Sequence, residues 1–166
     1  MEENQITHII NCSGDYSDQY FPQDFIYKTY FLKDSVRENI ECTFYDSIEF
    51  IENAKKKGGR IYVHCVQGVS RYQNLVFNFP HFSSRSTTIC LAYLIFSKKM
   101  TCQSAFDLVQ KLRPIANPNM IFNAQLFWWH MRLYQEYSSL PVSPRIFSVG
   151  SHQIEQPTYL VSRLVK

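Results

Sequence analysis

Residues 60–71 read Arg-Ile-Tyr-Val-His-Cys-Val-Gln-Gly-Val-Ser-Arg. The β-branched and aromatic residues at 61–63 predict a short strand that runs directly into Cys65. Five residues separate Cys65 from Arg71, and a loop of that length can turn several backbone N–H groups toward one anion. The planar guanidinium of an arginine matches two phosphate oxygens, and the same positive field favours the thiolate form of Cys65. This stretch therefore predicts a phosphate-binding loop at the end of a strand.

A thiolate held under a bound phosphate is a nucleophile aimed at phosphorus. We predict that Cys65 attacks a phosphate monoester and that Arg71 and the loop amides hold the phosphoryl oxygens. The predicted substrate-binding residues are Val66, Gln67, Gly68, Val69, Ser70 and Arg71. His64 precedes the nucleophile and either tunes it or forms a hydrogen bond within the core. The alternative for Cys65 itself is a buried structural cysteine.

The leaving oxygen of such a reaction must be protonated, so the site also needs an acid. A second predicted strand, residues 24–32, ends just before Asp34. The carboxyl ends of parallel strands meet at one edge of a sheet, which makes Asp34 the candidate acid. Position alone equally allows a turn or a helix-capping role for this residue.

The rest of the chain alternates between predicted strands and helices. A short run rich in isoleucine at 6–12 predicts another strand, and the glycine pair at 58–59 marks a helix C-terminus. Ser86, Thr101 and Asn119 are candidate N-caps. The predicted helices cover residues 44–57, 86–98, 101–112 and 120–137. This alternation indicates an α/β fold with a mostly parallel sheet flanked by helices.

Composition narrows the functional classes. The net charge of +3 is too small to favour nucleic acid as a partner, and no apolar run has the length of a membrane span. The five cysteines include no C-x-x-C pair, so a metal site is not expected. We expect reduced thiols and a cytoplasmic, and secondarily nuclear, protein. The Asn11-Cys12-Ser13 sequon is then a chance match.

Residues 64–71, together with the helical segment from Ser86 to Leu94, resemble the signature of the dual-specificity protein phosphatases, a cysteine-based family. The resemblance extends over about residues 6–136 and is greatest to plant and protist MAP kinase phosphatases. It implies a three-layer α/β sandwich without the first strand and helix of that family. It also implies Cys65 as nucleophile, Asp34 as acid and then base, and Arg71 as phosphate ligand. No cofactor or metal is implied, and the implied substrate is a phosphorylated, MAP kinase-like protein.

One departure from the family pattern falls within the site. The family has a serine or threonine directly after the signature arginine, whereas Tyr72 follows Arg71 here and the helical sequence resumes only at Ser86. The pair Ser70-Arg71 recurs as Ser84-Arg85, so the extra 14 residues are 72–85 or, equally, 71–84. We interpret them as an insertion or an unspliced intron. Arg85 could replace Arg71, but the loop would be too long for an anion nest, so we favour Arg71.

Two functions remain open at this point. The first is a dual-specificity protein phosphatase with a catalytic domain over residues 1–139, Ser86 supporting the nucleophile, and a tail or linker over 140–166. The second is a phosphatase-like module that binds phosphoproteins without turnover because the insertion disrupts the loop. The two differ in one observation: only the enzyme releases phosphate.

Overall fold

The computed structural model describes residues 6–66 and 84–134. Most of the predicted insertion, and the tail at 140–166, lie outside these ranges, so the predicted domain boundary remains a prediction. The described elements are β1 (Ile6–Asn11), β2 (Ile26–Thr29), a 3-10 turn η2 (Ile40–Thr43), α1 (Phe44–Lys56), β3 (Arg60–His64), α2 (Ser84–Lys98), α3 (Cys102–Leu112) and α4 (Met120–Tyr134).

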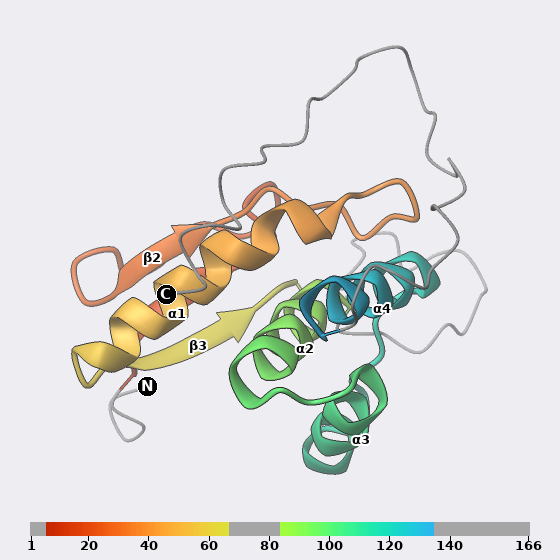
Figure 1. Ribbon diagram of the computed structural model, residues 1–166. Helices are drawn as coiled ribbons and strands as arrows, with labels where there is room; N and C mark the ends of the chain where they lie inside the picture. The colour runs from red at the N-terminus through yellow and green to blue at the C-terminus, as the bar shows by residue number, and fades with distance from the viewer. Residues whose placement is uncertain (1–5, 67–83, 135–166) are drawn as a thin grey trace, which may run out of the picture. The chain divides into compact units, whose positions relative to one another are not determined.

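The three strands form a parallel sheet in the order β2-β1-β3 (Figure 1). In the central strand, Ile9 pairs with Tyr27 on one side and Tyr62 on the other. Because β1 has a neighbouring strand on both sides, its consecutive residues Ile9 and Ile10 are both buried. The predicted α/β class with a parallel sheet and flanking helices is confirmed. All three strands end at one edge, where ligands of such sheets bind.

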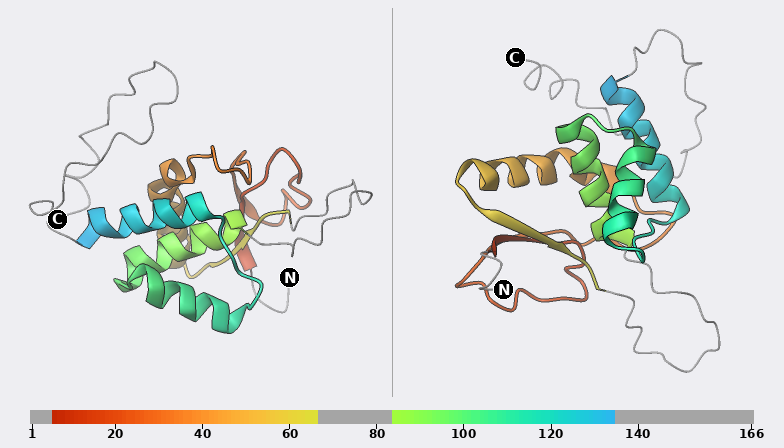
Figure 2. Two further views of the ribbon diagram at one scale, coloured as in Figure 1. Left: turned by 90° about the vertical axis from the view of Figure 1, so that its right-hand side faces the viewer. Right: turned by 90° about the horizontal axis from the view of Figure 1, so that it is seen from below.

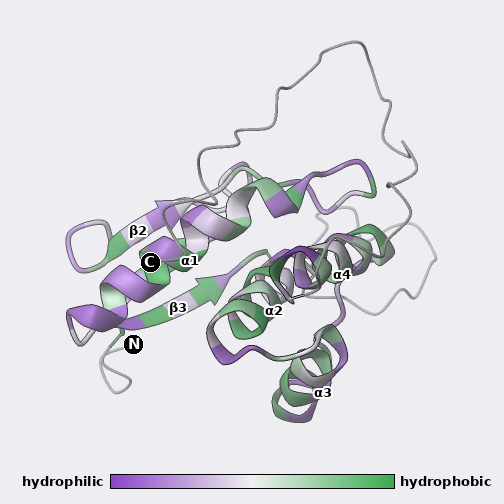
Figure 3. Ribbon diagram, in the orientation of Figure 1, coloured by the Kyte–Doolittle hydropathy of each residue, from purple (hydrophilic) through white to green (hydrophobic). Residues whose placement is uncertain are grey.

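The helices enclose an apolar core beside this sheet (Figure 2). Hydrophobic residues follow much of β3 and α2, whereas the C-terminal end of α1 is hydrophilic (Figure 3). Trp129 of α4 is almost completely buried and meets Phe44 edge-on, with 5.3 Å between ring centroids. Its indole nitrogen donates a hydrogen bond to the carbonyl of Ala92 in α2. These contacts fix α2, and therefore its N-terminus, relative to α1 and α4. No helix within the described ranges is long and apolar enough to cross a membrane.

Several predicted helix ends are confirmed. Gly58 adopts a φ of 72° after α1 and donates its N–H to the carbonyl of Lys55, as a glycine C-cap requires. Thr101 accepts a hydrogen bond from the N–H of Ser104, and Asn119 accepts one from the N–H of Phe122. These caps satisfy backbone donors that the first turn of a helix leaves open.

Two predicted boundaries were wrong. Helix α2 begins at Ser84, so Ser86 is its third residue and not its N-cap. The earlier start has a physical cause, because Ser84, Arg85 and Ser86 are all buried and held by the long-range contacts described below. Helix propensity depends on neighbouring residues alone and does not include such contacts. Strand β2 covers only Ile26–Thr29 of the predicted range 24–32. Its predicted start is instead a turn, in which the N–H of Asp24 bonds to the carbonyl of Phe21.

Candidate active site

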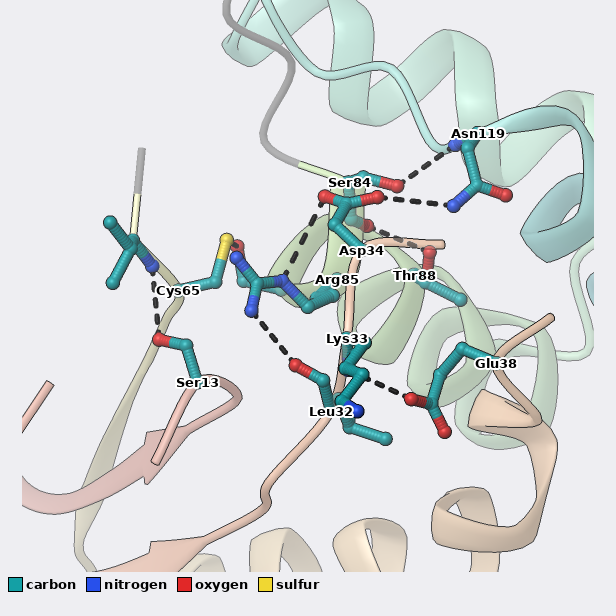
Figure 4. A network of polar contacts seen from close by, with 12 residues as sticks. Ser13, Leu32, Lys33, Asp34, Glu38, Cys65, Ser84, Arg85, Thr88 and Asn119 are labelled. Carbon is teal, nitrogen blue, oxygen red and sulfur yellow. Dashed lines mark hydrogen bonds and ion pairs between the residues drawn. The ribbon is translucent and has the colours of Figure 1, made fainter. Parts of the chain in front are cut away.

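The candidate site lies at the carboxyl edge of the sheet (Figure 4). Cys65 follows β3 directly, Ser13 lies in the turn after β1, and Asp34 lies in the segment after β2. The first turn of α2 brings Arg85 to the same edge (Figure 4), and the contact between Ser86 and Cys65 places Ser86 there too. Four segments that are far apart in sequence therefore meet at the position that the strand order predicts.

The predicted nucleophile lies against the start of α2. The Sγ atom of Cys65 is 3.2 Å from the Oγ atom of Ser86, and Cys65 is partly buried. A hydroxyl at this distance can donate a hydrogen bond to a thiolate. The N-terminus of a helix adds positive potential at the same place. The structure thus places Ser86, the predicted supporting residue, beside the sulfur of Cys65.

The turn after β1 supports the beginning of the Cys65 loop. The side chain of Asn11 accepts hydrogen bonds from the N–H and the hydroxyl of Ser13, at 3.0 and 3.2 Å. The Oγ atom of Ser13 in turn accepts a bond of 3.0 Å from the N–H of Val66. The loop amide that was predicted to hold a phosphoryl oxygen is therefore engaged by Ser13. It can bind substrate only by giving up that bond.

His64 continues β3 and lies beside the site. Its carbonyl accepts a hydrogen bond of 2.8 Å from the N–H of Cys12, and its ring stacks on Tyr62 with 5.5 Å between centroids. Burial lowers the pKa of the imidazole, which favours the neutral form near pH 7. These contacts show a role in positioning the strand end, while the choice between tuning and core bonding stays open.

Two further cysteines lie close to Cys65 but differ from it chemically. Cys12 is fully buried and Cys90 is partly buried, and burial raises the pKa of each thiol, to about 11 for Cys90. The negative charge of a Cys65 thiolate raises both further. Neither is a thiolate at neutral pH, so neither competes with Cys65 as a nucleophile. Within the described residues, no group of three or more His, Cys, Asp or Glu side chains is placed to hold a metal ion.

The predicted acid is held by two side chains from the other half of the chain. One oxygen of Asp34 accepts a hydrogen bond of 3.1 Å from the amide of Asn119, just before α4. The other oxygen lies 3.8 Å from the Nε atom of Arg85. The Asp34 side chain remains 33% exposed, so it can exchange a proton with a substrate or water. The structure thus brings Asp34 to the same edge as Cys65.

The remaining predicted substrate-binding residues, Gln67, Gly68, Val69, Ser70 and Arg71, lie outside the described residues. Arg85, the alternative to Arg71, is described, and its guanidinium lies at the site (Figure 4). Its Nη1 atom donates a hydrogen bond of 2.9 Å to the carbonyl of Leu32.

A pocket with a volume of about 420 Å³ opens beside Cys65 and Ser86. Its wall is rich in aromatic side chains, and it also includes one cation that the sequence analysis did not assign to the site, Arg113 after α3. The ring-bearing residues that line it are Tyr20, Phe21, Tyr27, Tyr62 and His64. An aromatic wall of this kind suits a substrate that carries a ring next to its phosphate.

Sequence reasoning missed Ser13 and Asn119 as parts of the site. Ser13 had a visible signal, because Asn11-Cys12-Ser13 follows a predicted strand that ends at the same edge as the strand before Cys65. Asn119 was recognised only as a helix cap. Its contact with Asp34 spans 85 residues of sequence, and no local pattern indicates it.

Comparisons with known proteins agree with this geometry. The sequence model of the dual specificity phosphatase catalytic domain matches residues 1–79 and 83–132. The break falls within the predicted insertion. The chain is similar to the protein-tyrosine-phosphatase MKP1 of Arabidopsis thaliana, with 35% identity over 99% of this chain and 19% of that protein. It is 32% identical to human dual specificity protein phosphatase 1, over 81% of this chain and 32% of that protein.

Solved structures show the same architecture. The crystal structure of DUSP15 matches with a TM-score of 0.67 and 30% identity, covering 81% of this chain and 76% of that chain. The human tyrosine phosphatase-like serine/threonine/tyrosine-interacting protein matches with a TM-score of 0.66 and 29% identity, over 80% of this chain and 81% of that chain. The chain spans less than a third of the length of the two sequence relatives named above.

Proposed function

Because the chain belongs to the dual specificity phosphatase family, we propose that it is a protein phosphatase that acts on phosphotyrosine and on phosphoserine or phosphothreonine. The observation that carries this proposal is the placement of Cys65 against Ser86 at the N-terminus of α2, with Asp34 at the same edge. This arrangement supplies a nucleophile, a hydroxyl that can stabilise its charge, and a carboxyl for proton transfer.

In the first step, the Cys65 thiolate attacks phosphorus and the bond between phosphorus and the substrate oxygen breaks. Asp34 gives its proton to the departing oxygen, so a neutral alcohol or phenol leaves. The phosphoryl group is now bound to the sulfur of Cys65. Positive charge at the helix N-terminus and on an arginine offsets the charge on the phosphoryl oxygens as this bond forms.

In the second step, water attacks the phosphocysteine. Asp34 is now ionised and takes a proton from that water, and the sulfur–phosphorus bond breaks to release inorganic phosphate. The Cys65 thiolate returns, and the hydroxyl of Ser86 is placed to stabilise it as a leaving group. The cycle uses only side chains of the chain and water.

We propose a phosphorylated MAP kinase-like protein as the substrate. The relatives named MKP1 and dual specificity protein phosphatase 1 support this choice. The aromatic pocket beside Cys65 supports action on a phosphorylated tyrosine ring. The uncharged residues Val66, Gln67, Val69 and Ser70 favour a protein over a phosphoinositide, because an inositol carrying several phosphates calls for basic residues in the loop.

A second function is a phosphoprotein-binding module without turnover. Its support is the inserted segment between Cys65 and α2, and the similarity to a human structure named as a phosphatase-like interacting protein. Such a module would keep the anion-binding end of α2 but fail to complete the reaction.

Phosphate release separates the two functions. We expect the purified chain to release phosphate from an aryl phosphate and from a doubly phosphorylated kinase activation-loop peptide, and Cys65→Ser to abolish both activities. Cys90→Ser is the matched control, because the raised pKa of this partly buried thiol keeps it out of the chemistry. Capture of the phosphopeptide by the wild-type chain without release would favour the binding module and contradict the enzyme.

A further inference from the structure

Two Ser-Arg pairs, Ser70-Arg71 and Ser84-Arg85, lie between Cys65 and the middle of α2, and the family pattern needs only one there. We propose that Arg85, and not Arg71, is the arginine that binds the phosphoryl group of the substrate. This inference rests on the proposed function and assigns a residue to it. It departs from the preference for Arg71 that the spacing in the sequence suggested.

The backbone position of Arg85 is fixed by its two neighbours. The hydroxyl of Ser84 accepts a hydrogen bond of 2.9 Å from the N–H of Asn119, and the hydroxyl of Ser86 lies 3.2 Å from the sulfur of Cys65. Because these residues are consecutive in the first turn of α2, the Cα atom of Arg85 is held beside the nucleophile. The residue after Arg71 is Tyr72, which has no short hydroxyl side chain to support a thiolate in the same way.

The side chain of Arg85 reaches toward the acid. Its Nη1 atom is bonded to the carbonyl of Leu32, and its Nε atom lies 3.8 Å from Asp34, close enough for an ion pair but too far for a hydrogen bond. The guanidinium also lies 6.0 Å from the centre of the Tyr16 ring. The buried thiol of Cys12 is close to both groups. The positive charge of Arg85 lowers its pKa, and the negative charge of a Cys65 thiolate raises it. Arg85 therefore lies between the nucleophile and the acid (Figure 4).

This guanidinium is buried without full compensation. Arg85 is only 6% exposed, and its Nε atom has no hydrogen-bond partner among the described residues. A buried charged donor without an acceptor is costly and unusual in folded proteins. A phosphoryl oxygen of a bound substrate would accept a hydrogen bond from this Nε atom. It would also replace the Asp34 carboxylate as the negative group that pairs with the guanidinium.

The length of the loop does not argue against Arg85. A loop from Cys65 to Arg85 is too long for its backbone N–H groups to converge on one anion. That limit applies to the backbone amides and not to the arginine side chain. The guanidinium, however, is positioned by α2, and α2 is fixed by α1, α3 and α4. Placement of Arg85 therefore requires no particular path for the segment between Cys65 and Ser84.

A deletion cannot decide between the two arginines, because removing residues 71–84 or residues 72–85 gives the same sequence. Point substitutions in the full chain can. We expect Arg85→Lys to lower kcat/KM for an aryl phosphate by about a hundredfold or more, because lysine keeps the charge but loses the planar fork. We expect Arg71→Lys to lose less than tenfold. Arg37→Lys, at an exposed position away from these contacts, is the control for any arginine change.

A binding measurement keeps the assignment testable if turnover is absent. Tungstate mimics phosphate, and its affinity for each folded variant can be measured by calorimetry, with far-UV circular dichroism to confirm folding. We expect Arg85→Lys to weaken tungstate binding by at least tenfold and Arg71→Lys to leave it nearly unchanged. This result without turnover by the wild-type chain would refute the phosphatase but support Arg85. A larger loss in Arg71→Lys, equal losses in both variants, or no tungstate binding by the wild-type chain would each overturn the assignment.

Discussion

The turn that carries Ser13 and the segment that carries Asp34 both follow parallel strands, yet they are held in different ways. Ser13 is fully buried, and it ties the Asn11 side chain to the Val66 amide through bonds of 3.0 to 3.2 Å. The side chain of Asp34 is one-third exposed, and its partners among the described residues, Asn119 and Arg85, belong to distant elements. The nucleophile is thus supported by a rigid buried turn, while the acid can release and regain its partners during a proton transfer. The four predictions below test this contrast between the nucleophile side and the acid side, from the largest effect to the smallest.

The largest effect is expected on the acid side. Asp34→Asn keeps the shape of the side chain but removes its proton, so we expect kcat to fall by about 10²- to 10⁴-fold. The loss should be greater for an alkyl phosphate, as in phosphoserine, than for an aryl phosphate, because an alkoxide is the poorer leaving group. Steady-state kinetics on both substrates measure this difference. Equal losses on the two would argue against Asp34 as the acid.

Asn119 connects the acid to the start of α4, and two substitutions separate its roles. Asn119→Ser can still cap the helix but cannot reach Asp34, so we expect about tenfold lower activity with little change in the free energy of unfolding. Asn119→Ala should lose activity and also about 1 kcal/mol of stability, because the cap is lost too. Kinetics and urea unfolding of both variants test this. Full activity in Asn119→Ser would mean that its bond to Asp34 has no catalytic effect.

On the nucleophile side, the first effect should appear as lost stability. Ser13→Ala leaves the N–H of Val66 without its partner and removes one of the two hydrogen bonds that the side-chain oxygen of Asn11 accepts. We therefore expect the free energy of unfolding to fall by about 1–3 kcal/mol in urea titrations. Ser104→Ala, at an exposed site in α3, is the matched control. A loss no larger than in that control would show that the turn after β1 does not stabilise the loop.

The smallest effect concerns pH. Burial lowers the pKa of His64 in the folded chain, so the unfolded chain takes up a proton more readily below its ordinary pKa of 6.5. Stability should therefore be complete above this pH and decline as the pH falls below it. Urea unfolding at pH 7.5 and 5.5 should show a smaller acid-induced loss in His64→Gln than in the wild-type chain. His130→Gln controls for loss of an imidazole elsewhere. An unchanged acid-induced loss in His64→Gln would contradict the burial effect.

Local patterns predicted much of this architecture. The strand before Cys65, the glycine end of α1 and the caps at Thr101 and Asn119 all depend on neighbouring residues, and the structure bears them out. The expected parallel sheet also predicted that Asp34 and Cys65 lie at one edge, because both follow strands. Contacts that join distant segments were not predictable in this way. Arg85 to Leu32 spans 53 residues and Asn119 to Asp34 spans 85, and no local pattern in the sequence indicates either pair.

The central claim is that Cys65 forms a covalent bond to phosphorus and that Asp34 governs how that bond forms and breaks. Rapid acid quench of the chain with a phosphotyrosine peptide, followed by peptide mass spectrometry, tests it directly. The account predicts one added phosphoryl group on the peptide that contains Cys65, and none in Cys65→Ser. Phosphate release with no adduct on that peptide, or an adduct that survives in Cys65→Ser, would contradict the account.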